Sequence, residues 1–306
     1  MKKLLVIALC LVMLFTFTAC SSAQFLSKSQ ANKLVAKYSE NGKLPQMEMT
    51  LTYKTGKNNT PMQIKVVYEL LLDKAPITVI SFINLLNNGR YNNVVIDSKA
   101  TTYMSIGRFT YVELPTDDSV GDKPSLPGSS SLDTATNRMY LLAKIRGTFV
   151  GEFKNNNFKP YGKVAEDDDG YAKFDMFSLA MYHDAPTSKS DDKEQQAEYK
   201  RAYNSSNGRL MISLGTTEKN TAPNYKEYAV FARPVSYSVS INGGDFSNPV
   251  SQLDSYLLAQ LKAVSSKTVS ISGNNYTPIQ IDVSFQMVAG SIDWANIKDN
   301  YLVEAE

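Results

Sequence analysis

Short apolar runs separated by turn-rich loops are the feature that most constrains how this chain folds. Runs of this length and spacing are typical of β-strands. They lie at 139–145, 174–182, 210–214, 228–231 and 279–288. Because only two principal helices accompany them, the pattern favours a β-rich barrel or sandwich over alternating strand–helix–strand units.

A predicted hairpin and the two predicted helices complete the pattern. Apolar residues alternate through 47–53 and again through 64–70, on either side of a turn-rich segment, which indicates a β-hairpin. Pro76 suits the first position of a helix, an apolar stripe follows at helical spacing, and Gly89 suits the helix end. A second apolar stripe at this spacing, from Leu253 to Val264, predicts another amphipathic helix.

The composition excludes several classes of protein. Of the 306 residues, 43% are apolar and 20% are charged, so the chain is too apolar to be disordered. A formal net charge of +2 gives no clustered basic excess, which disfavours a nucleic-acid partner. Structural zinc usually takes four Cys or His ligands, and Cys10, Cys20 and His183 supply three. We therefore expect no metal and no cofactor.

The first 19 residues form a predicted export signal. Two lysines precede an uncharged, mostly apolar run that is shorter than the ~20 residues of a membrane-spanning helix. Phe17 to Cys20 resemble the lipobox of bacterial lipoproteins, although that family usually has Leu where Phe17 stands. The resemblance implies lipidation of Cys20 and a chain anchored to the bacterial cell membrane, outside the cytoplasm. The alternative is an ordinary signal peptide, with Cys20 incidental. We expect residues 20–45 to be a tether, with a short helix near 30–38.

One segment resembles the cyclophilins, the cyclophilin-type peptidyl-prolyl cis-trans isomerases. Asp73 to Tyr91 read DKAPITVISFINLLNNGRY, similar to the strand end, Ala-Pro, helix and Gly-x-Tyr segment of that family. Weaker similarities follow in family order at 151–158, 177–181, 204–212 and 230–232. The resemblance implies a mainly β fold, an eight-stranded antiparallel β-barrel capped by two helices. It would span 46–290, with insertions near 112–138, 187–207 and 242–275 and a C-terminal tail at 291–306.

The resemblance also places an active site, in which one position departs sharply from the family. Twisting an X-Pro bond crosses a barrier of ~18–20 kcal/mol, and a donor aimed at the peptide stabilises the twisted state. In cyclophilins an arginine supplies that donor, and its position here holds Ser98. The residues expected to bind the proline-containing peptide are Tyr103, Met104, Ile106, Ala180, Met181, Met211 and Tyr228. The second family glutamine is replaced by Arg209, and either Arg108 or Arg209 is a candidate to replace the missing guanidinium.

These observations lead to one functional expectation and two alternatives. We expect a lipid-anchored, cyclophilin-like isomerase, weak or inactive, that acts on proline-containing segments of exported proteins. The first alternative is a non-catalytic, proline-peptide-binding or chaperone-like surface module. The second is a solute-binding or adhesive lipoprotein that works through its insertions. His183 has no identified nucleophile beside it, so we expect it to be structural or exposed and not catalytic.

Overall fold

The computed structural model describes most of the chain from Phe25 to Val303. The described residues are 25–55, 60–100, 102–114, 130–133, 137–144, 147–161, 170–183, 203, 205–214, 227–241, 244–249, 261, 264, 266, 268–271 and 274–303. Cys20 lies outside them, as do most of the predicted helix at 253–264 and most of the 187–207 insertion.

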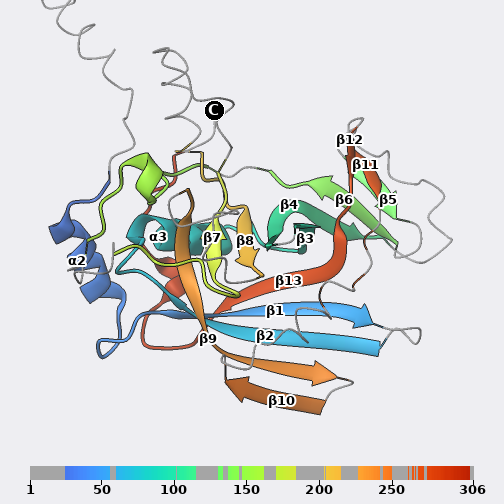
Figure 1. The fold of residues 1–306 in the computed structure, drawn as a ribbon, viewed down its shortest axis with the longest axis horizontal. Coiled ribbons are helices and arrows are strands. Elements are labelled where there is room, and N and C mark those ends of the chain that lie inside the picture. The colour runs from blue at the N-terminus through green and yellow to red at the C-terminus, as the bar shows by residue number, and fades with distance from the viewer. Residues whose placement is uncertain are drawn as a thin grey trace, which may run out of the picture.

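Eight strands close into an antiparallel barrel (Figure 1). In order around the ring they are β1 (Gln46–Thr55), β2 (Thr60–Leu70), β9 (Ala229–Ile241), β7 (Leu179–Met181), β8 (Leu210–Ser213), β4 (Tyr103–Glu113), β3 (Val94–Lys99) and β13 (Ile279–Met287). The β3–β4 pairing closes the ring, and each neighbouring pair in it is antiparallel. The predicted eight-stranded antiparallel barrel is therefore confirmed.

Alternation along the strands builds the barrel core. In β2, alternate residues from Met62 to Leu70 are buried, and the residues between them are partly exposed. Ile64 lies opposite Leu51 of β1, and Val66 lies opposite Met49, so apolar side chains from both strands meet inside the barrel. The period-two pattern of the sequence thus sets which face of the hairpin is buried.

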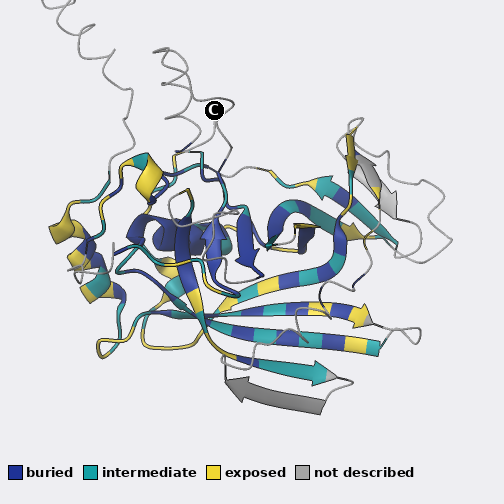
Figure 2. Cartoon of the chain, viewed as in Figure 1, coloured by how far each residue is buried: buried dark blue, intermediate teal, exposed yellow. Residues whose placement is uncertain are grey.

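Helix α3 (Pro76–Asn87) packs against this core. It starts with proline at its first turn, as predicted, and Gly89 follows its end with φ of +68°. The ring of Phe82 lies 5.2 Å from that of Phe231 in β9, measured between centroids. Figure 2 shows that α3, β7 and β8 are buried along most of their length. Leu261 and Val264, the described residues of the second predicted helix, are buried in the same core.

The segment expected as a tether packs against the barrel from Phe25 onward. Helix α2 (Lys28–Tyr38) begins at a Ser27–Gln30 capping box and buries Ala31, Leu34 and Tyr38. The C-terminal stretch meets this helix, because Trp294 stacks on Tyr38 at 5.8 Å. Leu34 and Tyr38 of this helix belong to the main apolar core. None of the described helices is both long and apolar enough to span a bilayer.

Further strands extend the barrel by pairing with two of its strands, β4 and β9. Strands β6 (Arg138–Leu142) and β5 (Ser130–Asp133) continue from β4, and β10 (Gly244–Pro249) pairs with β9. A two-stranded sheet of β11 (Val269–Ile271) and β12 (Asn274–Tyr276) lies beside β5 and β6, on the right in Figure 1. The remaining elements are the short 3-10 helices η1 (Lys154–Asn156) and η3 (Trp294–Asn296).

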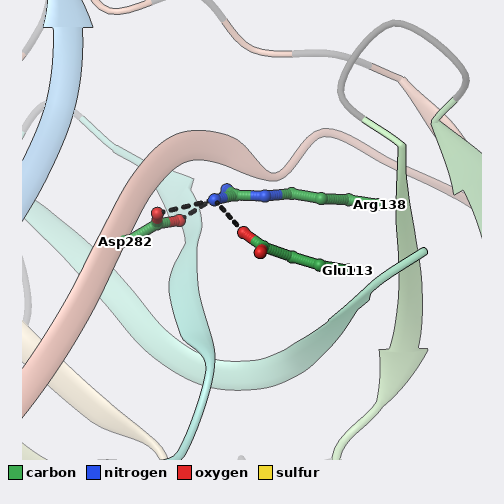
Figure 3. A network of polar contacts seen from close by, with 3 residues as sticks. All are labelled: Glu113, Arg138 and Asp282. Carbon is green, nitrogen blue, oxygen red and sulfur yellow. Dashed lines mark hydrogen bonds and ion pairs between the residues drawn. The ribbon is translucent and has the colours of Figure 1, made fainter. Parts of the chain in front are cut away.

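An arginine ties this extension to the barrel wall (Figure 3). Arg138 of β6 donates to both carboxylate oxygens of Asp282 in β13, at 2.7 and 2.8 Å. It also contacts Glu113 of β4 at 3.3 Å and lies 4.1 Å above the ring of Tyr111. This guanidinium is therefore paired with two carboxylates and one aromatic ring.

Candidate functional site

An apolar cluster covers the outside of four adjacent barrel strands. Its buried centre consists of Leu71, Ala180, Met211 and Val230. Its partly buried aromatic rim consists of Tyr103, Phe174, Tyr182 and Tyr228. We call these eight residues the outer face. Strand pairing holds the centre together, since Ala180 lies opposite both Met211 and Val230.

Four of the residues expected to bind peptide meet on the outer face. They are Tyr103 from β4, Ala180 from β7, Met211 from β8, and Tyr228, which directly precedes β9. Segments separated by more than a hundred residues thus contribute to one continuous apolar surface. Four members of the face were not expected from the sequence. One of them, Tyr182, lies two residues after Ala180 and shares its side of the chain, a signal that strand alternation provides.

The other three residues expected to bind peptide lie inside the barrel. Met104, Ile106 and Met181 are fully buried in the barrel core, with 0% exposure. Met104 follows Tyr103 and Met181 follows Ala180, so strand alternation turns their side chains inward. The structure thus places these three side chains in the barrel core and not on the outer face.

Ser98 occupies the position where the resemblance places an arginine. It is exposed near the end of β3, and its hydroxyl oxygen lies 2.8 Å from that of Ser105 in β4. Ser105 in turn lies opposite Met211. Two neutral hydroxyls thus occupy the edge of the outer face, and neither supplies a positive charge.

Asp97, the neighbour of Ser98, anchors an irregular part of the β3–β4 pairing. Its buried carboxylate accepts the backbone N–H of Arg108 at 2.8 Å and that of Phe109 at 3.2 Å. Burial raises the pKa of Asp97 to about 6, while these hydrogen bonds and the nearby charge of Arg209 act in the opposite direction. Asp97 therefore fixes the local backbone with its own oxygens occupied.

Two glycines, Gly107 in β4 and Gly208 shortly before β8, allow these two backbone segments to approach each other closely. Gly107 has φ of +93°, and a Cβ there would lie 3.2 Å from the carbonyl oxygen of Gly208. The buried Arg90 donates to the carbonyl oxygen of Gly107 at 2.5 Å. This contact ties the segment after α3 to β4.

Only one of the two candidate arginines reaches the outer face. The guanidinium of Arg108 lies 5.5 Å from the ring centre of Tyr276, in the extension. That of Arg209 lies 4.0 Å above the ring of Tyr182, a member of the outer face. The Nε of Arg209 is buried and has no hydrogen-bond partner within the described ranges. Among the described residues, no carboxylate forms an ion pair with Arg209.

Stacked aromatic rings support Tyr228 from behind. His183 lies between Tyr228 and Phe153, with its ring centre 4.9 Å from each. Its Nε2 lies 2.7 Å from the carbonyl oxygen of Glu227, and its side chain is buried. These contacts agree with a structural role for His183. Burial, together with neighbouring Tyr182, raises the pKa of Tyr228 to about 12, so its phenol stays neutral.

Glu152 connects the helix start to the rear of the outer face. Its buried carboxylate accepts the backbone N–H of Thr78 at 2.8 Å, in the first turn of α3, and the Thr78 hydroxyl at 3.0 Å. Tyr161 donates to the other oxygen at 3.4 Å. Burial raises the pKa of Glu152 to about 8, against these hydrogen bonds. Glu152 also lines a small pocket shared with Tyr228 and Val230.

The described residues include no group of three or more side chains arranged to hold a metal ion. Among the described residues, the outer face and its edge offer apolar contact, neutral hydroxyl groups and the guanidinium of Arg209.

Comparisons with known proteins find similarity at the level of solved structures. No protein-family model and no curated protein matches the chain. A cyclophilin type peptidyl-prolyl cis-trans isomerase of Cryptosporidium parvum is 11% identical, with a TM-score of 0.32, over 78% of this chain and 98% of its own. The same enzyme in the presence of the dipeptide Ala-Pro is 12% identical, with a TM-score of 0.34 and the same coverage. Values this low transfer neither activity nor ligand to this chain.

Proposed function

We propose that this protein binds proline-containing peptide segments on its outer face, and that its isomerase activity is weak or absent. The observation that carries the proposal is the meeting of Tyr103, Ala180, Met211 and Tyr228 on one outward surface. A proline ring is apolar and rigid, so a cluster of aromatic and sulfur-containing side chains suits it.

Weak activity follows from the chemistry of bond twisting. Only a donor that acts more strongly on the twisted peptide than on the planar one accelerates the exchange. Ser98 and Ser105 bond to each other and carry no charge. Arg209 is the guanidinium on this face, so any residual acceleration would depend on it.

NMR exchange spectroscopy on a short peptide with one X-Pro bond tests both parts of the proposal. We expect chemical-shift changes on binding, with little or no acceleration of cis–trans exchange at micromolar protein. Ser98→Arg should increase the exchange rate, because position 98 is exposed and can accept a long side chain. Rapid exchange with the unmodified chain would contradict the claim of weak activity.

Variants of the outer face test the location of binding. Tyr103→Ala and Met211→Ala should each weaken peptide binding, because each removes apolar surface from the cluster. Val235→Ala is the matched control, since Val235 is 38% exposed on β9 and lies outside the outer face. If the unmodified chain binds no proline peptide, the solute-binding or adhesive alternative is favoured.

We also propose that the chain acts outside the cytoplasm, held to a bacterial cell membrane by lipid on Cys20, with exported proteins as clients. The lipobox-like sequence before Cys20 supports this location. Two or more buried acyl chains hold a protein on a bilayer durably. In a bacterial host, Cys20→Ala should move the protein out of the membrane fraction. Retention of this variant in the membrane would contradict the proposal.

A further inference from the structure

The side chain of Arg209 is held in place, but the part of the chain that the structure describes offers it no hydrogen-bond acceptor. Its guanidinium stacks on Tyr182 at 4.0 Å, and its Nε is buried without a partner among those residues. A buried donor without a partner costs free energy, which a bound acceptor would recover. The arrangement is therefore typical of a group prepared for a ligand.

Arg209 also lies at a defined spacing from the centre of the outer face. Arg209 and Met211 are two residues apart at the start of β8, so their side chains share one side of the chain, roughly 7 Å apart. Ala180 of β7 and Tyr182, directly after β7, are also two residues apart. The Tyr182 N–H donates to the Arg209 carbonyl oxygen at 2.8 Å. An extended peptide spans this distance in about two residues.

The carboxylates near Arg209 leave its donors available. Both oxygens of Asp97 accept backbone N–H groups, and Asp97 makes no ion pair within 4.0 Å of Arg209. Glu227 is exposed to solvent, and it is close enough to influence the neighbouring Tyr228 electrostatically. Neither carboxylate engages the guanidinium, whose planar group of donors matches the geometry of a carboxylate.

We propose that Arg209 binds the carboxylate of an acidic residue within two positions of the proline, so that the outer face selects acidic proline-containing segments. This inference rests on the proposed peptide binding and names the substrate class of the same site. The stacked Tyr182 holds the guanidinium in place and thereby reduces the entropy lost on binding.

Three peptides that differ at one position test the preference. They carry Glu, Gln or Lys next to a single proline, and their affinities are measured by fluorescence anisotropy at low and high salt. We expect the unmodified chain to bind the Glu peptide about tenfold more tightly than the Gln peptide, and the Lys peptide most weakly. The advantage of Glu should shrink as salt increases.

Two arginine variants assign the preference to a residue. Arg209→Gln should abolish the advantage of Glu, so that the Glu and Gln peptides bind with equal affinity. Arg108→Gln should preserve the advantage, because Arg108 stacks on Tyr276 in the extension. Circular dichroism of both variants confirms that they fold.

The outcomes separate this inference from the proposed function. Equal binding of Glu and Gln peptides would overturn the role of Arg209 and leave peptide binding intact. A preference that survives in Arg209→Gln would do the same. Failure of all three peptides to bind would overturn both.

Discussion

Two arginines in this barrel have the same aromatic support but different partners. Arg138 lies 4.1 Å above Tyr111 and Arg209 lies 4.0 Å above Tyr182. Arg138 also engages Asp282 through two hydrogen bonds, together with Glu113 (Figure 3). No carboxylate among the described residues pairs with Arg209. A stacked arginine can thus fasten a strand extension at one place and present donors to a ligand at another.

Asp282, Asp97 and Glu152 also differ in whether a guanidinium lies close to them. Asp282 has a bidentate guanidinium partner. Asp97 is buried with backbone N–H groups and a more distant arginine charge, and its pKa rises to about 6. Glu152 is buried against the start of a helix with neutral partners, and its pKa rises to about 8. A buried carboxylate without a close cation therefore favours its protonated form.

The largest expected effect concerns Glu152, the carboxylate with no cation. Its folded-state pKa lies above the usual value of 4.5, so the folded protein binds the proton more strongly than the unfolded chain. The free energy of unfolding should therefore fall as pH rises from about 4.5 to 8, on the order of 5 kcal/mol in total. Glu152→Gln should remove most of this fall, because an amide does not titrate in this range. The amide oxygen can still accept from Thr78.

Urea unfolding of both proteins at several pH values measures this effect. The interval from pH 6 to 8 is the most informative, because Asp97 is ionised in the folded state above about pH 6. Parallel pH profiles for the two proteins would contradict the prediction.

Asp97 should produce a smaller effect of the same sign at lower pH. Its pKa is raised from 3.8 to about 6, so unfolding free energy should fall by about 3 kcal/mol as pH rises across that interval. Asp97→Asn should flatten this dependence. Its overall stability should be lower, since the amide offers one acceptor where the carboxylate offers two. The slope between pH 4 and 6, measured by urea unfolding, is the diagnostic quantity, and an unchanged slope would argue against this titration.

Removing the paired arginine should cost more stability than removing the unpaired one. Arg138→Ala leaves Asp282 without its bidentate partner and removes the contact with Tyr111. We expect a loss of about 2 kcal/mol at neutral pH, measured from the midpoint of urea unfolding. A loss well below 1 kcal/mol would mean that water replaces Arg138 at little cost.

Arg209→Ala should change stability least, by less than about 1 kcal/mol. It removes stacking on Tyr182 and some packing of the side-chain stem, but no acceptor loses a hydrogen bond from the guanidinium. The measurement is the same urea midpoint. A loss equal to that of Arg138→Ala would show that Arg209 holds the fold, which would weaken the comparison between the two arginines.

Local patterns predicted the elements of this fold better than their assembly. Alternation around Leu51 and Ile64 located the hairpin, and Pro76 with Gly89 bounded α3 closely. Closure of the barrel depends on pairing between β3 and β4 and between β3 and β13, which are long-range contacts. Periodicity alone predicted only a β-rich fold, and the family resemblance was needed to predict a closed barrel.

The candidate site, too, could be predicted only in part from the sequence. The resemblance grouped Tyr103, Met104 and Met211 together, but it did not separate outward from inward side chains, and Met104 lies in the core. Strand alternation would have separated them. The stacking of Arg209 on Tyr182 depends on the β7–β8 register, which no local pattern contains.

If Cys20 carries the proposed lipid, the packing of α2 against the barrel limits how far the domain can stand from the membrane. Phe25, where the packed part begins, is five positions after Cys20, and a fully extended chain over five positions reaches about 17 Å. A lipid on Cys20 would therefore keep the domain within a few nanometres of the bilayer, with the α2 side turned toward it. Such a protein would sample only those segments that pass close to the membrane surface.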